Sequence, residues 1–238
     1  MSSAGLSIAM TSEDDVIQKL KALSDPVAVE GMARFGINPE NALGISITIL
    51  QKMAREIGRD HALAEKLWAS AIREARILAC YVDQPEMVSE AQMERWVHDF
   101  NSWDICDVCC SYLLDKTEWA YTKAVEWTDR QEEFVKRAGF VLMAALSVHD
   151  KKANDEKFIE FLPLLVKGSN DDRNYVKKAV NWALRQIGKR NLALNRLAIQ
   201  TAQEIKRLDL RSARWIASDA LRELTSQKIQ TRLKNKKI

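Results

Sequence analysis

Apolar residues recur at spacings of three and four along most of the chain, which is the period of an amphipathic α-helix. The pattern is clearest in four segments, residues 61–82, 131–148, 172–189 and 211–226. In the first of them the apolar positions are Leu63, Leu67, Ala71, Ala75, Leu78, Ala79 and Val82. Partner helices are expected between these segments, near residues 40–57, 90–115, 117–127 and 156–167. No apolar run reaches the length of about 18 residues that a membrane span requires, so none is expected.

The four helices share a plan in which a basic residue precedes Ala and an apolar tail. Arg76, Arg137 and Lys178 occupy matching places in REARILA, VKRAGFVLM and VKKAVNWAL. Weak self-similarity with two helices per unit is typical of HEAT or armadillo repeats. The sequence therefore predicts an all-α fold: a right-handed α-α superhelix of helical hairpins with a concave basic face. A helical bundle without repeats is the alternative.

The domain boundaries follow from the same pattern. We expect a flexible N-terminal arm at residues 1–15, a single HEAT-like domain at 16–228 and a basic C-terminal tail at 229–238. Composition agrees with a helical protein, because the 238 residues include only eight Gly and four Pro. The first residues lack a basic region and a long apolar core, so they do not resemble a signal peptide. A cytoplasmic protein is expected.

Two stripes of cations and Trp residues lie beside the apolar faces. Lys178, Trp182, Arg185 and Lys189 follow spacings of four, three and four, and Arg211, Trp215 and Arg222 repeat the pattern. Cations and flat rings on an exposed face suit a polyanion such as DNA. The alternative is that each Trp packs at a helix–helix seam while the basic side chains extend outward. The net charge of +3 permits a local basic groove but does not itself indicate nucleic-acid binding.

The segment NSWDICDVCC, residues 101–110, contains a candidate reactive carboxylate. Asn101 or Ser102 can cap a helix on which Trp103 and Asp107 share a face as i and i+4. A carboxylate beside an indole can receive a cation or a cation-like transition state. The alternative is that Asp107 only pairs with an Arg of the next repeat.

The cysteines of this segment do not indicate a metal or disulfide site. Cys106, Cys109 and Cys110 crowd one expected helix, and neither a second Cys pair nor a His at ligand spacing accompanies them. We interpret them as small apolar side chains at a helix seam. The sequence predicts no metal and no cofactor.

Five ordered segments resemble the AlkD-like DNA alkylation repair family, the HEAT-repeat alkylpurine DNA glycosylases. They are MARFGINPENALGI (32–45), LWASAIREARILA (67–79), SWDICD (102–107), EEFVKRAGFVLM (132–143) and YVKKAVNWALRQIGKRN (175–191). The resemblance extends over about residues 30–226. It departs from the family pattern at Trp103, where the motif often has two Trp residues.

The resemblance implies hydrolysis of the N-glycosidic bond of positively charged N3- or N7-alkylated purines in duplex DNA, without strand cleavage. It places the catalytic carboxylate on Asp107, a functional Trp on Trp103, a phosphate-binding Arg on Arg137 and a DNA-facing Trp on Trp182. A monomer is expected, with DNA as its partner and with association to the nucleoid when it is bound to DNA. The alternatives are a HEAT-repeat protein that binds DNA structures without catalysis and, less favoured, a protein-interaction scaffold.

Overall fold

The computed structural model describes residues 12–235, and this part of the chain contains helices, turns and loops but no strand. The predicted all-α class is therefore confirmed. The chain forms two compact units, the first ending at Ser89 and the second beginning at Glu90. Within the described residues, no helix is long and apolar enough to cross a membrane.

The first unit consists of short helices. They are α1 (Glu13–Ala22), α2 (Pro26–Met32), the 3-10 helix η1 (Ala33–Phe35), α3 (Ile47–Ile57), α4 (His61–Ala69), α5 (Arg73–Val82) and the 3-10 helix η2 (Pro85–Met87). The single helix predicted over 61–82 is wrong, because the chain turns between α4 and α5. Ala71 lies in the left-handed region with φ 57°, and the Ser70 hydroxyl donates to Leu67 O and accepts from Ile72 N. Both helices keep the apolar period because they pack against each other.

A buried carboxylate holds the long loop before α3. Glu74 on α5 is fully buried and accepts hydrogen bonds from the backbone amides of Leu43 (2.7 Å) and Gly44 (3.0 Å). Gly44 has φ +78°, and a Cβ there would lie 2.2 Å from the carbonyl oxygen of Asp25. The helix predicted over 40–57 therefore begins only at Ile47, because this loop occupies its first part.

The second unit contains the segments with the candidate site residues. Its α-helices are α6 (Glu90–His98), α7 (Trp103–Tyr112), α8 (Ala120–Glu126), α9 (Glu133–His149), α10 (Glu156–Ile159), α11 (Leu162–Gly168), α12 (Asn174–Gly188), α13 (Leu192–Arg207), α14 (Arg211–Leu224) and α15 (Gln227–Asn235). The 3-10 helices η3 (Leu114–Lys116) and η4 (Trp127–Asp129) flank α8. The segment predicted as one helix over 90–115 is two, α6 and α7. The basic tail predicted at 229–238 is helical as far as Asn235, and the arm predicted at 1–15 lies mostly outside the described residues.

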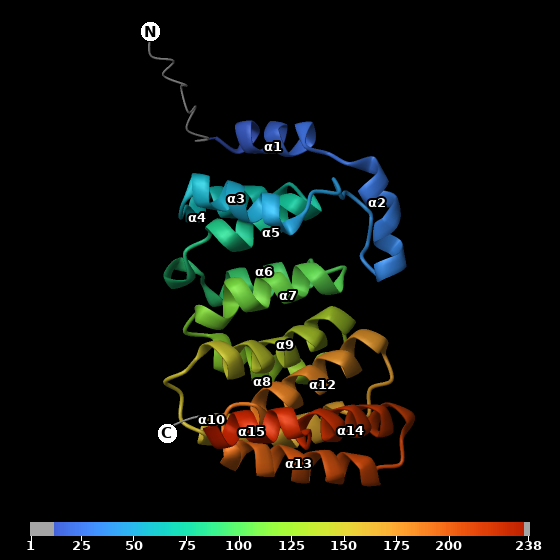
Figure 1. Ribbon diagram of the computed structural model, residues 1–238. Helices are drawn as coiled ribbons and strands as arrows, with labels where there is room; N and C mark the ends of the chain where they lie inside the picture. Colours follow the sequence, from blue (N-terminus) through green and yellow to red (C-terminus); the bar gives the residue numbers. More distant parts are fainter. Residues whose placement is uncertain (1–11, 236–238) are drawn as a thin grey trace. The chain divides into compact units, whose positions relative to one another are not determined.

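Four helices of the second unit form a row, in which α7 contacts α9, α9 contacts α12 and α12 contacts α14. A second set packs against this row, with α8 on α9, α11 on α12 and α13 on α14 (Figure 1). Each such pair is a helical hairpin, which is the unit of a HEAT-like repeat. These four helices, α7, α9, α12 and α14, are called the row.

Buried thiols occupy the seam between the first two helices of the row. Cys106 Sγ lies 3.8 Å from the carbonyl oxygen of Phe134, and Cys110 Sγ lies 3.8 Å from that of Ala138. All four cysteines are buried, and none of them is in a disulfide bond. The interpretation of the cysteines as small side chains at a helix seam is therefore confirmed for Cys106 and Cys110. The close approach brings the α7 face that carries Asp107 against α9.

Candidate functional site

Asp107 and Arg137 form a two-bond ion pair between α7 and α9. Arg137 Nε donates to Asp107 Oδ1 at 3.0 Å, and Arg137 Nη2 donates to Asp107 Oδ2 at 2.8 Å. The Asp107 side chain keeps 20% of its surface exposed, whereas that of Arg137 keeps only 7%. A bidentate pair fixes the plane of the carboxylate as well as its distance. Asp107 is thus an oriented carboxylate with partial access to solvent.

The same guanidinium also binds the third helix of the row. Arg137 Nη1 donates to the backbone carbonyl of Tyr175, in the first turn of α12, at 2.6 Å. The guanidinium therefore faces Asp107 and Tyr175, and it joins α7, α9 and α12. The resemblance predicted that Arg137 holds a phosphate, and that role stays a prediction. In this structure the visible role of Arg137 is to position Asp107.

The pKa of Asp107 is shifted in a direction that is unusual for an ion-paired carboxylate. Burial raises its pKa above the ordinary value, and the charge and hydrogen bonds of Arg137 act in the opposite direction without cancelling that effect. The nearby Asp104 adds a smaller contribution that also raises the pKa. Arg137 itself has a raised pKa: its own burial favours the neutral form, but the charge and hydrogen bond of Asp107, together with smaller contributions from Cys106 and Cys110, outweigh that effect. The anionic form of Asp107 is therefore held in a poorly solvated position.

Two of the predicted Trp residues, Trp103 and Trp182, lie on α7 and α12 of the row. Trp103 is the first residue of α7, four positions before Asp107 and on the same helix face, and it is partly buried. Ser102 occupies the N-cap position, but its hydroxyl donates to the carboxylate of Asp104 instead of capping the backbone. Trp182 is partly buried on α12, about two turns beyond Tyr175.

The first turns of α12 and α14 present exposed cations and an exposed ring. Lys178 and Arg211 are exposed, and Trp215 is 41% exposed. The Nζ of Lys177 lies 5.7 Å from the centre of the Trp215 ring, so the two helices share a cation–π contact. These side chains have the character predicted for a DNA-binding surface.

The second half of the α12 stripe is different, because its cations are bound to carboxylates of α14. Arg185 Nη1 donates to Glu223 Oε2 at 2.5 Å, and Lys189 Nζ donates to Glu223 Oε1 at 2.7 Å. Arg222, predicted to continue the α14 stripe, pairs with Asp219. Arg185 and Lys189 therefore lie at the seam between α12 and α14, whereas the largely exposed Arg222 pairs within its own helix.

Two residues near the site were not found from the sequence. Tyr175 contributes a main-chain carbonyl, for which no side-chain pattern exists. Lys177 contacts Trp215 across two helices, so spacing along either helix cannot identify it. Among residues 12–235, no group of three or more His, Cys, Asp or Glu side chains is placed to hold a metal ion.

Hairpins packed along a row, with an oriented carboxylate at one end and exposed cations further along, define a helical-repeat protein suited to a charged polymer. The family model described as DNA alkylation repair enzyme matches residues 16–217. The chain belongs to this DNA alkylation repair family.

The fold comparison agrees. The chain is similar, with a TM-score of 0.73, to a solved structure from a new family of proteins related to the HEAT-like repeat DNA glycosylases with affinity for branched DNA structures. The identity is 21%, and the similarity covers 89% of this chain and 95% of that one. The HEAT-like fold is thereby confirmed, while the concave basic face stays a prediction. No curated protein matches the sequence.

Proposed function

We propose that the protein is a DNA glycosylase that hydrolyses the N-glycosidic bond of positively charged N3- or N7-alkylated purines in duplex DNA. It would act as a monomer and leave the strands intact. Alkylation at N3 or N7 makes the purine cationic, so the base departs with the electron pair of its bond to C1′ and becomes neutral. The sugar then develops oxocarbenium character, as in glycoside hydrolysis.

The oriented, partly exposed carboxylate of Asp107 is the observation that carries this proposal. An anion fixed in a poorly solvated position stabilises a developing positive charge without having to reorganise. Its bonds to Arg137 hold both oxygens in place, and Arg137 is held in turn by Tyr175. The same carboxylate can orient the water that adds to C1′ and can accept the proton that this water loses.

The neighbouring helices supply groups for holding the duplex. Lys178 and Arg211 are exposed cations that can meet phosphates, which contributes affinity without reading sequence. Trp103, on the helix of Asp107, and Trp182, on α12, would contact the sugar and backbone of the damaged nucleotide. Trp215 offers an exposed ring next to Arg211.

The test is release of 7-methylguanine from methylated duplex DNA by the wild type and by Asp107→Asn. We expect the asparagine variant to be slower by about 10²–10³-fold, the usual cost of removing one group that stabilises transition-state charge. Glu223→Gln is a matched control, because Glu223 is also a partly exposed, ion-paired carboxylate of the row. It should retain release within about twofold, as for a surface substitution away from the chemistry. Equal rates for wild type and Asp107→Asn would remove Asp107 from the mechanism.

A second candidate is a DNA-structure-binding protein without turnover. One specific observation favours it: the bidentate pairing with Arg137 neutralises the charge of Asp107 as seen from a distance. The similar solved structure is also described by its affinity for branched DNA. Tight, salt-sensitive binding of a four-way junction with no base release from methylated DNA would favour this candidate over the glycosylase.

A further inference from the structure

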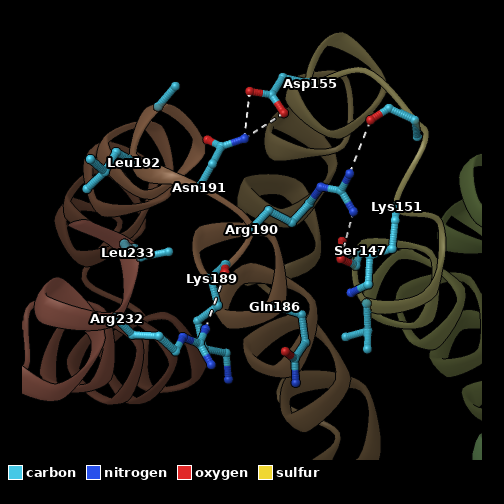
Figure 2. Close-up of a pocket in the computed structure, with 13 residues that line it drawn as sticks. Ser147, Lys151, Asp155, Gln186, Lys189, Arg190, Asn191, Leu192, Arg232 and Leu233 are labelled. Atoms are coloured by element: carbon cyan, nitrogen blue, oxygen red, sulfur yellow. Dashed lines mark hydrogen bonds between the residues drawn. The ribbon is translucent and has the colours of Figure 1, made fainter. Parts of the chain in front are cut away.

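A pocket of about 900 Å³ opens in the second unit at the ends of α9 and α12 that follow Ser147 and Gln186. Figure 2 shows side chains from α9, the loop at 151–155, α12, the start of α13 and α15 around it. The volume lies within the usual range for small-molecule sites, about 300–1,000 Å³.

This pocket is separate from the Asp107 site. Arg137 and Ser147 both lie on α9, ten residues and therefore about 15 Å apart along the helix axis. On α12, Tyr175 and Lys189 are separated by about 21 Å by the same rise per residue. A ligand in the pocket would therefore lie at the opposite end of both helices from the carboxylate of Asp107.

The charged side chains that line the pocket are predominantly cationic. Lys151, Lys189, Arg190 and Arg232 line it, and the one carboxylate among its lining residues is that of Asp155. That carboxylate accepts two hydrogen bonds from the Asn191 side-chain amide, at 2.8 and 2.9 Å. The excess of positive charge favours an anionic ligand and disfavours a cationic one.

The four cations divide into structural and accessible ones. Arg190 donates to the backbone carbonyls of Ser147, Asp150 and Ala153 and lies 3.9 Å from the centre of the Phe158 ring, so it is fixed in the wall. Lys189 is held by Glu223. Lys151 and Arg232, by contrast, are exposed, and Figure 2 shows them on opposite sides of the pocket. Arg232 Nη2 donates to the backbone carbonyl of Lys189 at 3.2 Å, and its other N–H groups, together with the ammonium of Lys151, can bind a ligand.

The remaining wall is suited to the organic part of such a ligand. Apolar side chains of Val148, Ala153, Leu192 and Leu233 line it, together with the amide of Gln186. A bare inorganic anion would leave these surfaces unused, whereas a ligand that joins a phosphate to a sugar and base would contact both kinds of wall. We propose that this pocket binds a phosphate-bearing nucleotide, either free or as the 5′-phosphorylated end of a DNA strand. This site is independent of the proposed glycosylase activity.

The test is isothermal titration calorimetry of the full chain, which measures the dissociation constant of 2′-deoxyadenosine 5′-monophosphate and, separately, of deoxyadenosine. A second arm uses a short single strand with a 5′-phosphate and the same strand with a 5′-hydroxyl. Lys151→Glu and Arg232→Glu should each weaken binding of the phosphorylated ligand by about tenfold or more, as expected for lost hydrogen bonds to a charged group. Lys152→Glu is the matched control, because Lys152 is the exposed neighbour of Lys151 but does not line the pocket. It should stay within about twofold of the wild type.

The two titrations distinguish a free nucleotide from the end of a DNA strand. Dependence on Lys151 and Arg232 with the free nucleotide supports a soluble ligand, and the same dependence only with the phosphorylated strand supports a strand end. Equal binding of ligands with and without phosphate would overturn the proposal. So would equal weakening by Lys152→Glu, which would indicate diffuse attraction, or no binding of either phosphorylated ligand.

Discussion

Asp107 and Glu223 are two carboxylates that bridge neighbouring helices of the same row, and they are bound in different ways. Asp107 on α7 has one partner, the guanidinium of Arg137 on α9. Glu223 on α14 has two, Arg185 and Lys189 on α12. The side chains are similarly exposed, 20% for Asp107 and 28% for Glu223. Exposure alone therefore does not distinguish them.

The balance between burial and partner charge does distinguish them. At Asp107, burial prevails over one guanidinium and the pKa is raised, whereas at Glu223 burial is outweighed by Lys189 and Arg185 and the pKa is lowered. A carboxylate paired with two cations is stable as an anion and would stabilise the positive charge on a reacting sugar only weakly. A carboxylate with one cation and poor solvation gains more from an additional positive charge nearby. Similar seams thus fit a structural role at Glu223 and the chemical role that we propose for Asp107.

The largest expected difference between the two carboxylates is in their contribution to the free energy of unfolding. Arg137→Met should lower the free energy of unfolding by about 3–5 kcal/mol, because it leaves Asp107 as a poorly solvated charge without its partner. It also leaves the carbonyl of Tyr175 without this donor. Arg185→Met should cost less, about 1–2 kcal/mol, because Lys189 still binds Glu223. Urea unfolding of both variants measures the difference.

A double variant provides the control for that result. When Asp107→Asn is added to Arg137→Met, no charge remains without a partner, so part of the lost stability should return. A coupling of about 1 kcal/mol or more is expected for residues in direct contact. Additive losses would show that Asp107 and Arg137 stabilise the fold independently, and the comparison with Glu223 would then fail.

A smaller effect should appear in DNA affinity, where Lys178 and Arg211 are compared with a cation that is held in an ion pair on its own helix. Lys178→Ala with Arg211→Ala should weaken binding to a short duplex by about tenfold and reduce the slope of log K against log salt by about 1 per removed phosphate contact. Arg222→Ala is the control, because Arg222 was predicted in the same stripe but pairs with Asp219. Its salt slope should match that of the wild type. An equal loss of DNA affinity in all variants would mean that the ion pair with Asp219 does not keep Arg222 from binding a phosphate.

Much of the fold could be predicted from periodicity, and the reasons for the exceptions are local. The segment at 61–82 keeps one apolar period across Ser70–Ile72, so nothing in the pattern reveals the left-handed turn at Ala71. The helix α13 was not among the predicted segments, although Asn191 caps it by accepting from the amide of Leu194. Spacing showed that the α12 cations share a stripe with Trp182. It could not show their pairing, because Glu223 comes from another helix.

The candidate site was predictable in its residues but not in their bonds. Asp107 and Trp103 follow from one helix face, and Arg137 follows from the repeat and the family resemblance. The sequence left open whether Asp107 pairs with an Arg of the next repeat, and it does. That pairing depends on the register of α7 against α9, which the buried thiols of Cys106 and Cys110 help to set. Such a register is a property of packing and leaves no signal in either helix alone.

The smallest expected effect, and the most direct comparison of the two carboxylates, is their pH dependence. Asp107 has a raised pKa in the folded state, so its protonation favours folding. The stability of the wild type relative to Asp107→Asn should therefore fall as the pH rises from 3.8, the ordinary value, through the raised one. Glu223 has a lowered pKa in the folded state, so it contributes stability above its ordinary value of 4.5 and loses it as the pH falls through the lowered one. Relative to Glu223→Gln, the wild type should thus gain stability with rising pH in the acid range. Urea unfolding of the wild type and both variants at a series of acid pH values gives the two slopes, and slopes of the same sign would show that burial does not prevail over Arg137 at Asp107.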